Sequence, residues 1–213
     1  MPTPSCLHPF CYIGSGTSRS VPEPKSIIGV LALQGDFDAH KRTLKKLGAK
    51  VVLVRKPEQL DELDGLIIPG GESSTFLKLL GDGGFEKLRD FVLHKPVFGT
   101  CAGCILLARD IENPEQRGLG AIDIRVRRNA YGRQIDSFIS QASTKFGNIE
   151  MVFIRAPKIV DVGRDVEVLA SEKGDPVLVQ QGKVMAATFH PELSEDAAVH
   201  KRFLELVGKE SED

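Results

Sequence analysis

The sequence predicts a three-layer α/β fold in which helices cover both faces of a doubly wound, mixed and mostly parallel sheet. The first observation is the unbroken apolar run at 27–33, which is typical of a strand buried on both faces of a parallel sheet. The second is the alternation of such runs with helical segments in the first half of the chain, which implies right-handed β-α-β crossovers. The third is a second half richer in strand patterns, which adds antiparallel pairs.

The first half of the chain is expected to alternate strands with helices. After the strand at 27–33, a helix is expected from about Asp36, its N-cap, to Leu47, with Gly48 as the C-terminal stop. The remaining expected elements are, in order, a strand at 51–54, a short helical segment at 57–63, a strand at 66–68, a helix from about 76, and a strand, turn and helix over 95–108.

The second half of the chain is expected to be mainly strands. Residues 121–128 alternate apolar and charged side chains, as a half-exposed strand does. Gln181-Gly182-Lys183 predicts a tight hairpin turn between two strands. The remaining expected elements are strands at 150–157, 166–170, 177–181 and 184–188, and a last helix over 194–207 with Ser194 as its cap and Gly208 at its end.

The composition excludes several functional classes. The chain has 213 residues, which suits one α/β domain, and its net charge of −1 gives no electrostatic case for binding nucleic acid or an anionic membrane. No apolar run approaches the roughly 20 residues of a membrane span, and the N-terminus lacks the apolar region of a signal peptide. The four cysteines are therefore expected to be reduced thiols, and the predicted location is cytoplasmic.

The first 25 residues differ from the rest of the chain. Residues 1–25 are rich in Pro, Ser, Gly and Thr without an apolar period, so a disordered N-terminal extension is predicted. A single domain is predicted over 26–208, with a tail at 209–213. Cys6, His8 and Cys11 cluster in the extension but are too few to hold a metal ion, so no metal site is predicted.

The predicted chemistry centres on a cysteine at a sharp strand-to-helix turn. Cys101 has Gly99 and Gly103 two residues to either side, which is the thiol form of the G-x-S-x-G nucleophile elbow. Such a turn strains the central residue, and side chains at the flanking positions would clash where strand and helix cross. The helix N-terminus favours an anion such as a thiolate, and thiols in this kind of site have a pKa of roughly 3.5–7.5 instead of about 8.5. Cys101 is therefore predicted to be a nucleophile.

Two other interpretations of this cysteine stay open. A cysteine at a strand–helix junction can simply be a small buried apolar residue. Cys101 and Cys104 also form a C-x-x-C at a helix start, as in a thiol-disulfide oxidoreductase. Against the redox interpretation, the chain has no tryptophan, the motif lies far from the N-terminus, and Cys104 sits one turn into the helix, where a packed residue is expected.

A glycine pair ends the strand at 66–68. Ligands of doubly wound folds bind beyond the carboxyl ends of the strands, and Gly70-Gly71 leaves backbone N–H groups free to approach a ligand or an oxyanion. Ser73 and Ser74 are expected to cap the following helix. Glu72, between the glycines and the cap, is then a candidate to bind an amine or an amide.

The last strand runs into Phe189-His190-Pro191-Glu192. His190 and Glu192 are two residues apart, so an extended backbone, held rigid by Pro191, would place both side chains on one face. The carboxylate could then orient one imidazole nitrogen while the other faces a thiol. This is the nucleophile, base and orienting-group arrangement of a catalytic triad.

Six stretches carry a resemblance to one enzyme family. Those that resemble the class I (triad) glutamine amidotransferases are 99–103, 69–73 and 189–192. Those that resemble, within that class, the glutaminase subunits of pyridoxal 5′-phosphate synthase are 30–35, 128–134 and 153–157. The resemblance extends from Ile27 to about Gly208 and implies the flavodoxin-like fold of that class and a single glutaminase domain. Cys104 stands where an apolar residue is expected, a departure that should not affect catalysis.

The resemblance implies a role for each site residue. Cys101 attacks the side-chain carboxamide of L-glutamine, His190 carries the proton from the thiol to the leaving ammonia, and Glu192 orients His190. The backbone N–H groups of Gly71 and Ala102 form the oxyanion hole. The residues that the resemblance places against glutamine are Gly71, Glu72, Ser73, Arg128, Ile154 and Arg155. The reaction runs through a glutamyl thioester, and no cofactor is implied.

The resemblance also implies a protein partner. Ammonia passes to a synthase subunit, a (β/α)₈ barrel, which builds pyridoxal 5′-phosphate in a large hetero-oligomer. The free glutaminase is expected to be weakly active until the synthase docks and orders the oxyanion loop. Two alternatives stay open: an amidotransferase that serves another pathway, and a non-enzymatic member of the fold that acts only as a binding partner.

Overall fold

The computed structural model describes residues 26–129 and 137–210, without the side chains of Lys209 and Glu210. The predicted extension at 1–25, with its cysteine and histidine cluster, lies outside the described residues. So do residues 130–136, which hold most of the loop motif at 128–134, and the tail residues 211–213.

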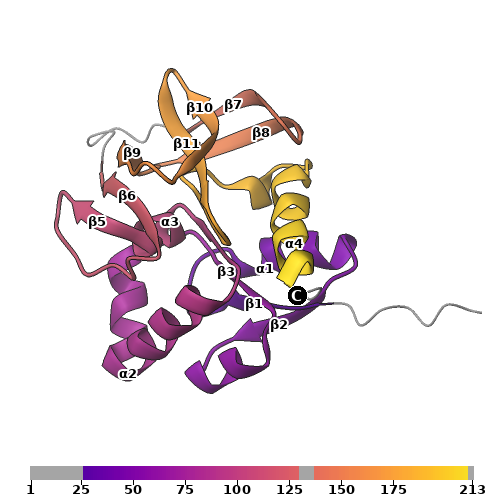
Figure 1. The fold of residues 1–213 in the computed structure, drawn as a ribbon, viewed down its shortest axis with the longest axis vertical. Coiled ribbons are helices and arrows are strands. Elements are labelled where there is room, and N and C mark those ends of the chain that lie inside the picture. The colour runs from indigo at the N-terminus through magenta and orange to yellow at the C-terminus, as the bar shows by residue number, and fades with distance from the viewer. Residues whose placement is uncertain (1–25, 130–136, 211–213) are drawn as a thin grey trace, which may run out of the picture.

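A seven-stranded sheet forms the centre of the molecule, in the order β10-β11-β12-β4-β3-β1-β2 (Figure 1). Its strands are β1 (Ile27–Leu31), β2 (Lys50–Val54), β3 (Gly65–Ile68), β4 (Val97–Thr100), β10 (Glu167–Glu172), β11 (Asp175–Gln181) and β12 (Val184–Ala187). The strands from β12 to β2 pair in parallel, whereas β11 and β10 add antiparallel pairs at one edge. The predicted mixed, mostly parallel sheet is therefore confirmed.

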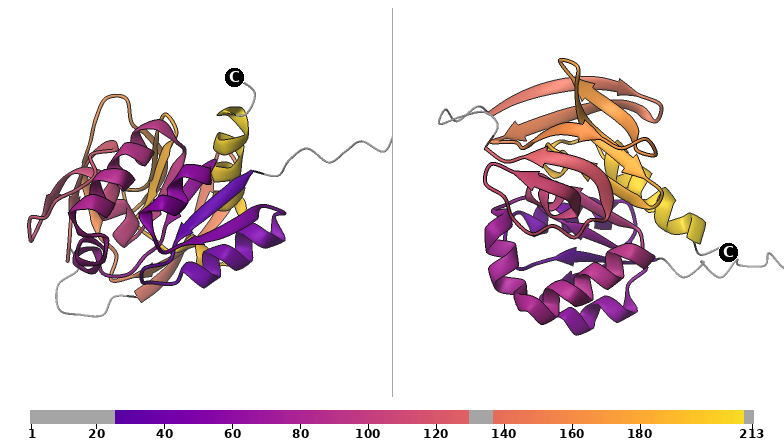
Figure 2. Two further views of the ribbon diagram at one scale, coloured as in Figure 1. Left: turned by 90° about the horizontal axis from the view of Figure 1, so that it is seen from below. Right: turned by 60° about the vertical axis from the view of Figure 1, so that its left-hand side comes forward.

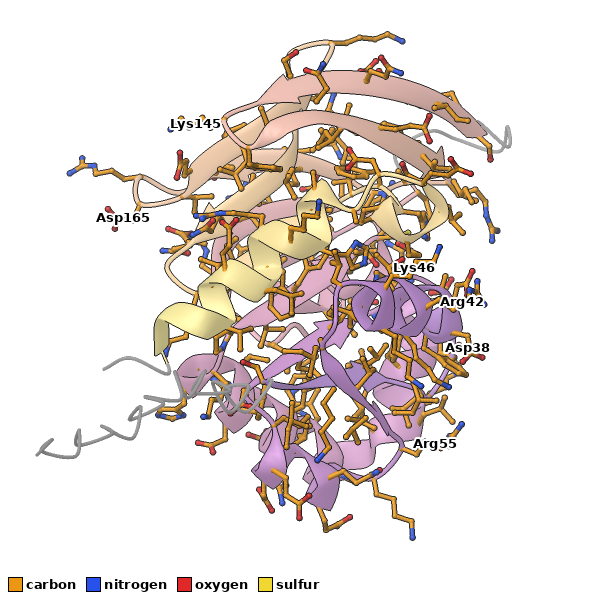
Figure 3. The ribbon with its side chains drawn as sticks, turned by 90° about the vertical axis from the view of Figure 1, so that its right-hand side faces the viewer. Asp38, Arg42, Lys46, Arg55, Lys145 and Asp165 are labelled. Carbon is orange, nitrogen blue, oxygen red and sulfur yellow. The ribbon has the colours of Figure 1, made fainter. Side chains whose placement is uncertain are left out.

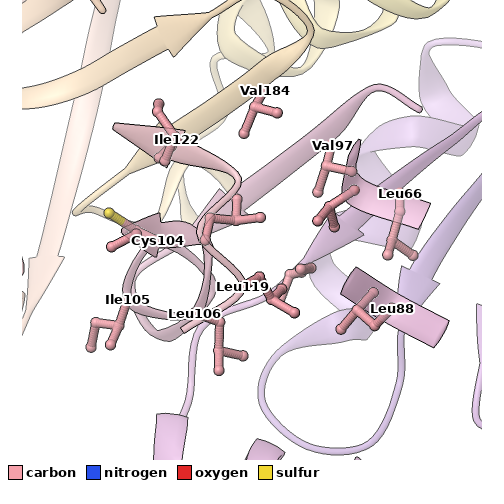
Figure 4. Close-up of a cluster of buried hydrophobic side chains, with 14 of the residues drawn as sticks. Leu66, Leu88, Val97, Cys104, Ile105, Leu106, Leu119, Ile122 and Val184 are labelled. Atoms are coloured by element: carbon pink, nitrogen blue, oxygen red, sulfur yellow. The ribbon is translucent and has the colours of Figure 1, made fainter. Parts of the chain in front are cut away.

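Helices cover both faces of this sheet, and each face has its own apolar core. The helical elements are α1 (Phe37–Lys46), η1 (Pro57–Glu62), α2 (Ser73–His94), α3 (Ala102–Leu107), η2 (Pro191–Leu193) and α4 (Ala198–Glu210). Strand β3 shows the division: Leu66 and Ile68 pack with α2 and α3 (Figure 4), while Ile67 packs with α1 and α4. The three predicted layers are thus present. No helix within the described ranges has the length and apolar character that a bilayer span requires.

Two small sheets complete the fold: the first lies between α2 and the opposite end of the molecule, and the second lies with the β10–β11 hairpin at that opposite end (Figure 2). One contains β5 (Ala108–Glu112), β6 (Ile122–Arg127) and β9 (Lys158–Val162), and the other is the hairpin of β7 (Ser137–Thr144) and β8 (Gly147–Ile154). The alternation predicted at 121–128 is confirmed by β6. Strands β5, β7 and β9 were not predicted, because their sequences contain no apolar run longer than two residues.

Helix boundaries were predicted well for α1 and poorly for α2 and α4. The Asp36 side chain caps α1 by accepting the N–H of Ala39, as expected. Helix α2 begins at Ser73, three residues earlier than predicted, and its N-cap is Glu72. The predicted start of the last helix at Ser194 is wrong, because the η2 turn occupies the preceding residues and Asp196 accepts the N–H of Ala198 where α4 starts. Helix α4 also continues through Gly208.

Candidate active site

The nucleophile elbow has the strained geometry that its glycines predict. Cys101 lies between β4 and α3 with φ 47° and ψ −101°, a backbone conformation that residues other than glycine rarely adopt. A Cβ on Gly99 would lie 2.6 Å from the backbone of Gly103, and a Cβ on Gly103 would lie 2.1 Å from the carbonyl oxygen of Ile68. Both positions therefore require glycine, because helix α3 crosses the sheet too closely for a side chain.

Sheet order brings the elbow to the segment that carries His190. Strands β4 and β12 pair in parallel with Thr100 opposite Ala187, so their carboxyl ends lie side by side. The N–H of Cys101 donates to the carbonyl of Ala187 at 2.8 Å, and the N–H of His190 donates to Val152 of β8 at 2.8 Å. These bonds hold Cys101 and His190 close together at the carboxyl ends of the strands, although the two residues are 89 positions apart in the chain.

His190 and Glu192 make the predicted contact by a different backbone path. Nδ1 of His190 lies 2.8 Å from Oε1 of Glu192. The predicted extended backbone is wrong, because Pro191 opens the 3₁₀ turn η2 and His190 itself has φ −111° and ψ 83°. Proline fits the first position of such a turn, since its fixed φ is helical and its missing N–H would be unpaired there. The turn folds the carboxylate back onto the imidazole.

Burial and charge set the protonation of this pair. Burial alone lowers the pKa of His190, but hydrogen bonds and charges from the Cys101 and Glu192 side chains outweigh it and raise this pKa to about 10. Burial tends to raise the pKa of Glu192, yet neighbouring His40 and His190 bring it below its usual value. At neutral pH the imidazole is therefore protonated on both nitrogens, and Nδ1–H donates to the Glu192 carboxylate. Such an imidazolium can donate a proton to a leaving group.

A pocket of about 300 Å³ opens in front of Cys101. The residues that line it are Gly71, Glu72, Ser73, Cys101, Ile105, Arg128, Asn129, Ile154, Arg155, Pro157 and His190. All six residues implied to contact glutamine are among them. Three lining residues were not predicted as site residues: Ile105, Asn129 and Pro157. Ile105 follows Cys101 by one helical turn, and that spacing was a usable signal.

The glycine pair after β3 packs closely against the imidazole of His190 and the side chain of Gln34. A Cβ on Gly70 would lie 2.4 Å from Cε1 of His190, so glycine is needed for the imidazole to fit. The Gln34 carboxamide accepts the N–H of Glu72 and donates to its carbonyl, each at 3.1 Å. Gly71 has φ +135°, which favours glycine, and a Cβ there would meet Gln34. Ala102, the other residue implied for the oxyanion hole, is the fully buried first residue of α3.

Glu72 has structural partners that the sequence did not suggest. Its carboxylate accepts the N–H of Ser74 at 3.3 Å as the cap of α2, and it pairs with Nη2 of Arg128 at 2.9 Å. The Ser73 hydroxyl, expected to be the cap, instead donates to Gln116. Arg128 is therefore already neutralised in part, whereas Arg155 has no ion-pair partner among the described residues.

Arg155 and Ile154 reach the pocket because β8 ends there. The strand stops at Ile154, earlier than the predicted 157. Arg155 has φ 43°, a left-handed backbone conformation that residues other than glycine rarely adopt. This reversal places successive residues on the pocket wall. Arg155 thus offers an exposed guanidinium beside the candidate nucleophile.

Cys104 does not have the properties of a resolving thiol. It is fully buried among apolar side chains of the elbow helix and its neighbours, among them Leu119 and Ile122 (Figure 4). Burial, with the neighbouring Cys101, raises the pKa of its thiol far above the usual range. Because thiol–disulfide exchange needs an accessible thiolate, the interpretation of Cys104 as a packed residue is favoured.

A family model agrees with the resemblance. The SNO glutamine amidotransferase family model matches residues 30–209. The chain belongs to this family. The match covers every described residue of the candidate site and begins after the extension at 1–25.

Individual members of the family align over nearly their whole length. The Koribacter versatilis protein named pyridoxal 5′-phosphate synthase subunit PdxT is 69% identical over 182 residues, which cover 84% of this chain and 95% of that protein. The Thermosipho africanus protein of the same name is 53% identical over 186 residues, covering 85% and 99%. A crystal structure of a glutamine amidotransferase has 50% identity and a TM-score of 0.80, covering 85% of this chain and 98% of that one.

Proposed function

We propose that this chain is the glutaminase subunit of a pyridoxal 5′-phosphate synthase, and that it hydrolyses L-glutamine and delivers the ammonia to a synthase subunit. The observation that carries the proposal is the convergence of Cys101 and His190 on the wall of one pocket, with the buried Glu192 carboxylate 2.8 Å behind the imidazole of His190. Relatives named as subunits of that synthase, at 69% and 53% identity, support the pathway.

The proposed reaction begins with a thiolate–imidazolium pair. The Cys101 sulfur attacks the side-chain carbonyl carbon of glutamine, and the carbonyl π electrons move to oxygen. The backbone N–H groups of Gly71 and Ala102 stabilise that oxyanion; losing one such donor typically costs about 3 kcal/mol of barrier. His190 then gives its proton to the leaving nitrogen, the C–N bond breaks, and ammonia leaves a glutamyl thioester.

The second half of the reaction regenerates the thiolate–imidazolium pair. His190, now neutral, takes a proton from water as that water attacks the thioester carbon. The C–S bond breaks, glutamate leaves, and the proton returns the pair to its starting state. Glu192 stays ionised throughout and stabilises the imidazolium, which is consistent with the lowered pKa of its carboxyl group.

Binding of the glutamine backbone is assigned to the cationic side of the pocket. Arg155 is exposed at the pocket wall and suits the α-carboxylate, because guanidinium–carboxylate hydrogen bonds are charge-assisted. Glu72, which bridges Arg128 and the start of α2, suits the α-amino group. Gly71, Ser73, Arg128 and Ile154 complete the proposed contacts along the rest of the wall.

The partner is proposed from the relatives and from the resemblance. We expect a (β/α)₈-barrel synthase subunit that receives ammonia within a large hetero-oligomer. Glutamate release from L-glutamine should be low for the chain alone and should rise strongly when a pyridoxal 5′-phosphate synthase subunit is added.

Matched cysteine variants test the chemistry in the same assay. Cys101→Ala should abolish glutamate release, whereas Cys104→Ala should retain it, because only the former removes the nucleophile. Equal activity with and without the synthase subunit would refute the pathway while keeping the glutaminase. No release in either condition would refute the enzymatic function.

A further inference from the structure

Behind Glu192, on the side away from the pocket, lie two buried histidines that the proposed mechanism does not use. His40 of α1 and His200 of α4 are both fully buried. Nδ1 of His40 lies 2.9 Å from Nε2 of His200. Nε2 of His40 lies 3.3 Å from Oε2 of Glu192 and 3.2 Å from Oγ1 of Thr100, the residue before the elbow cysteine. One imidazole therefore contacts both the end of β4 and the η2 turn, the two segments that carry the site.

The second carboxylate oxygen of Glu192, Oε2, needs a hydrogen-bond donor. His190 takes Oε1 at 2.8 Å, while Oε2 is buried without a well-aligned hydrogen bond among the described residues. An unpaired buried carboxylate oxygen is costly, so a donor at this position is strongly favoured. Nε2 of His40 hydrogen-bonds Oγ1 of Thr100 and lies 3.3 Å from Oε2, so a proton on this nitrogen is placed to be shared between the two oxygens.

The two histidines can adopt one favourable arrangement of protons. Nδ1 of His200 has no partner in the described part of the chain, so a proton there would be a buried unpaired donor. The proton of neutral His200 therefore sits on Nε2 and is donated to Nδ1 of His40. His40 is then protonated on Nε2, which faces Glu192 and Thr100. His200 thus selects the tautomer of His40 that donates toward the carboxylate.

Both histidines stay neutral in this arrangement. Burial lowers the pKa of His40, outweighing the attraction of Glu192 and of Asp36, while His190 lowers it further. Burial and His40 lower the pKa of His200 to about 3. The other charged groups near Glu192 are Arg42, Lys46 and Glu195, which line a neighbouring surface cavity with it. Figure 3 shows Asp38, Arg42 and Lys46 along the outward side of α1, away from the buried His40.

We infer that His40 is a positioning residue for the Cys101–His190–Glu192 group, with His200 fixing its tautomer. Its Nε2–H holds Oε2 of Glu192, so that Oε1 remains directed at His190. The inference rests on the proposed roles of those three residues. Without this donor, Glu192 would stabilise the His190 imidazolium less well, and a Cys101 thiolate would form only at higher pH.

Two variants of similar size separate hydrogen bonding from packing. His40→Met removes the donor, whereas His40→Gln retains an N–H group near the position of Nε2, and both residues favour a helix. The first readout is the pH dependence of Cys101 alkylation by iodoacetamide in the isolated chain, followed by mass spectrometry of its peptide. We expect the midpoint to rise by about one pH unit in His40→Met, which slows alkylation about tenfold below the midpoint, and to stay near wild type in His40→Gln.

The second readout is glutamine hydrolysis with the synthase subunit present. His40→Met should lower kcat about tenfold with KM changed less than about twofold, because the substrate-binding wall is untouched. An unshifted alkylation profile in His40→Met, or an equal shift in His40→Gln, would overturn the inference. If His40→Met does not fold, His200→Met and His200→Gln replace the pair, and an unshifted profile in His200→Met overturns it. Alkylation needs no glutaminase activity, so inactivity of the wild type would refute the proposed function alone.

Discussion

Replacement of Gly103 by alanine tests whether the close approach of α3 to the sheet holds the site together. A Cβ at this position would lie 2.1 Å from the carbonyl oxygen of Ile68, and an ordinary contact needs at least 3.4 Å. Both sides of the clash are backbone, so α3 must retreat by about 1.3 Å. Overpacking of this kind costs about 1–3 kcal/mol, and the rigid backbone favours the upper value. For a chain of this size we expect the melting temperature to fall by about 6–12 °C.

The same displacement should reduce catalysis more than stability. Cys101 and Ala102 begin the displaced helix, and a misplacement of about 1 Å can cost about 100-fold in rate. The assay compares kcat for glutamine hydrolysis, with the synthase subunit present, to the thermal midpoint. The control is Gly83→Ala, inside α2, where a Cβ meets nothing within 4 Å and the helix should gain stability. A Gly103→Ala protein that melts within about 1 °C of wild type and keeps its kcat would refute the reasoning.

Three further predictions follow from individual side chains. Burial lowers the pKa of His200 from 6.5 to about 3, so between these pH values the unfolded chain binds a proton at His200 and the native chain does not. The free energy of unfolding should therefore drop as the pH falls through this range, by up to about 1.4 kcal/mol per pH unit. Urea titrations at several pH values should show that the free energy of unfolding of His200→Gln depends less on pH. Cys104→Ala should keep kcat within about twofold while costing roughly 1 kcal/mol of stability; loss of activity at intact stability would favour the oxidoreductase interpretation. Arg155→Gln should raise the KM for glutamine about 10- to 100-fold with a smaller change in kcat, and an unchanged KM would remove Arg155 from the carboxylate site.

Prediction from sequence succeeded where a strong local pattern decides the structure. The apolar runs of the parallel strands, the Asp36 cap and the glycines around Cys101 each act over a few residues. It failed where tertiary contacts override weak patterns. Strand β7 is mostly polar apart from the pair Phe138-Ile139 and forms by pairing with β8. Glu72 caps α2 while it pairs with Arg128, 56 positions away.

The sequence by itself determined the family and predicted the nucleophile and its base, because each lies in a short motif with its own chemistry. Only the tertiary structure decided how these motifs meet. Parallel pairing of β4 with β12 places Cys101 beside His190, a neighbourhood that sheet order sets and local pattern does not. The buried contact between His40 and His200 joins residues 160 positions apart, from two helices that pack on the same face of the sheet. Lone histidines resemble structural residues in a sequence, and it is burial beside Glu192 that supports the role proposed for this pair.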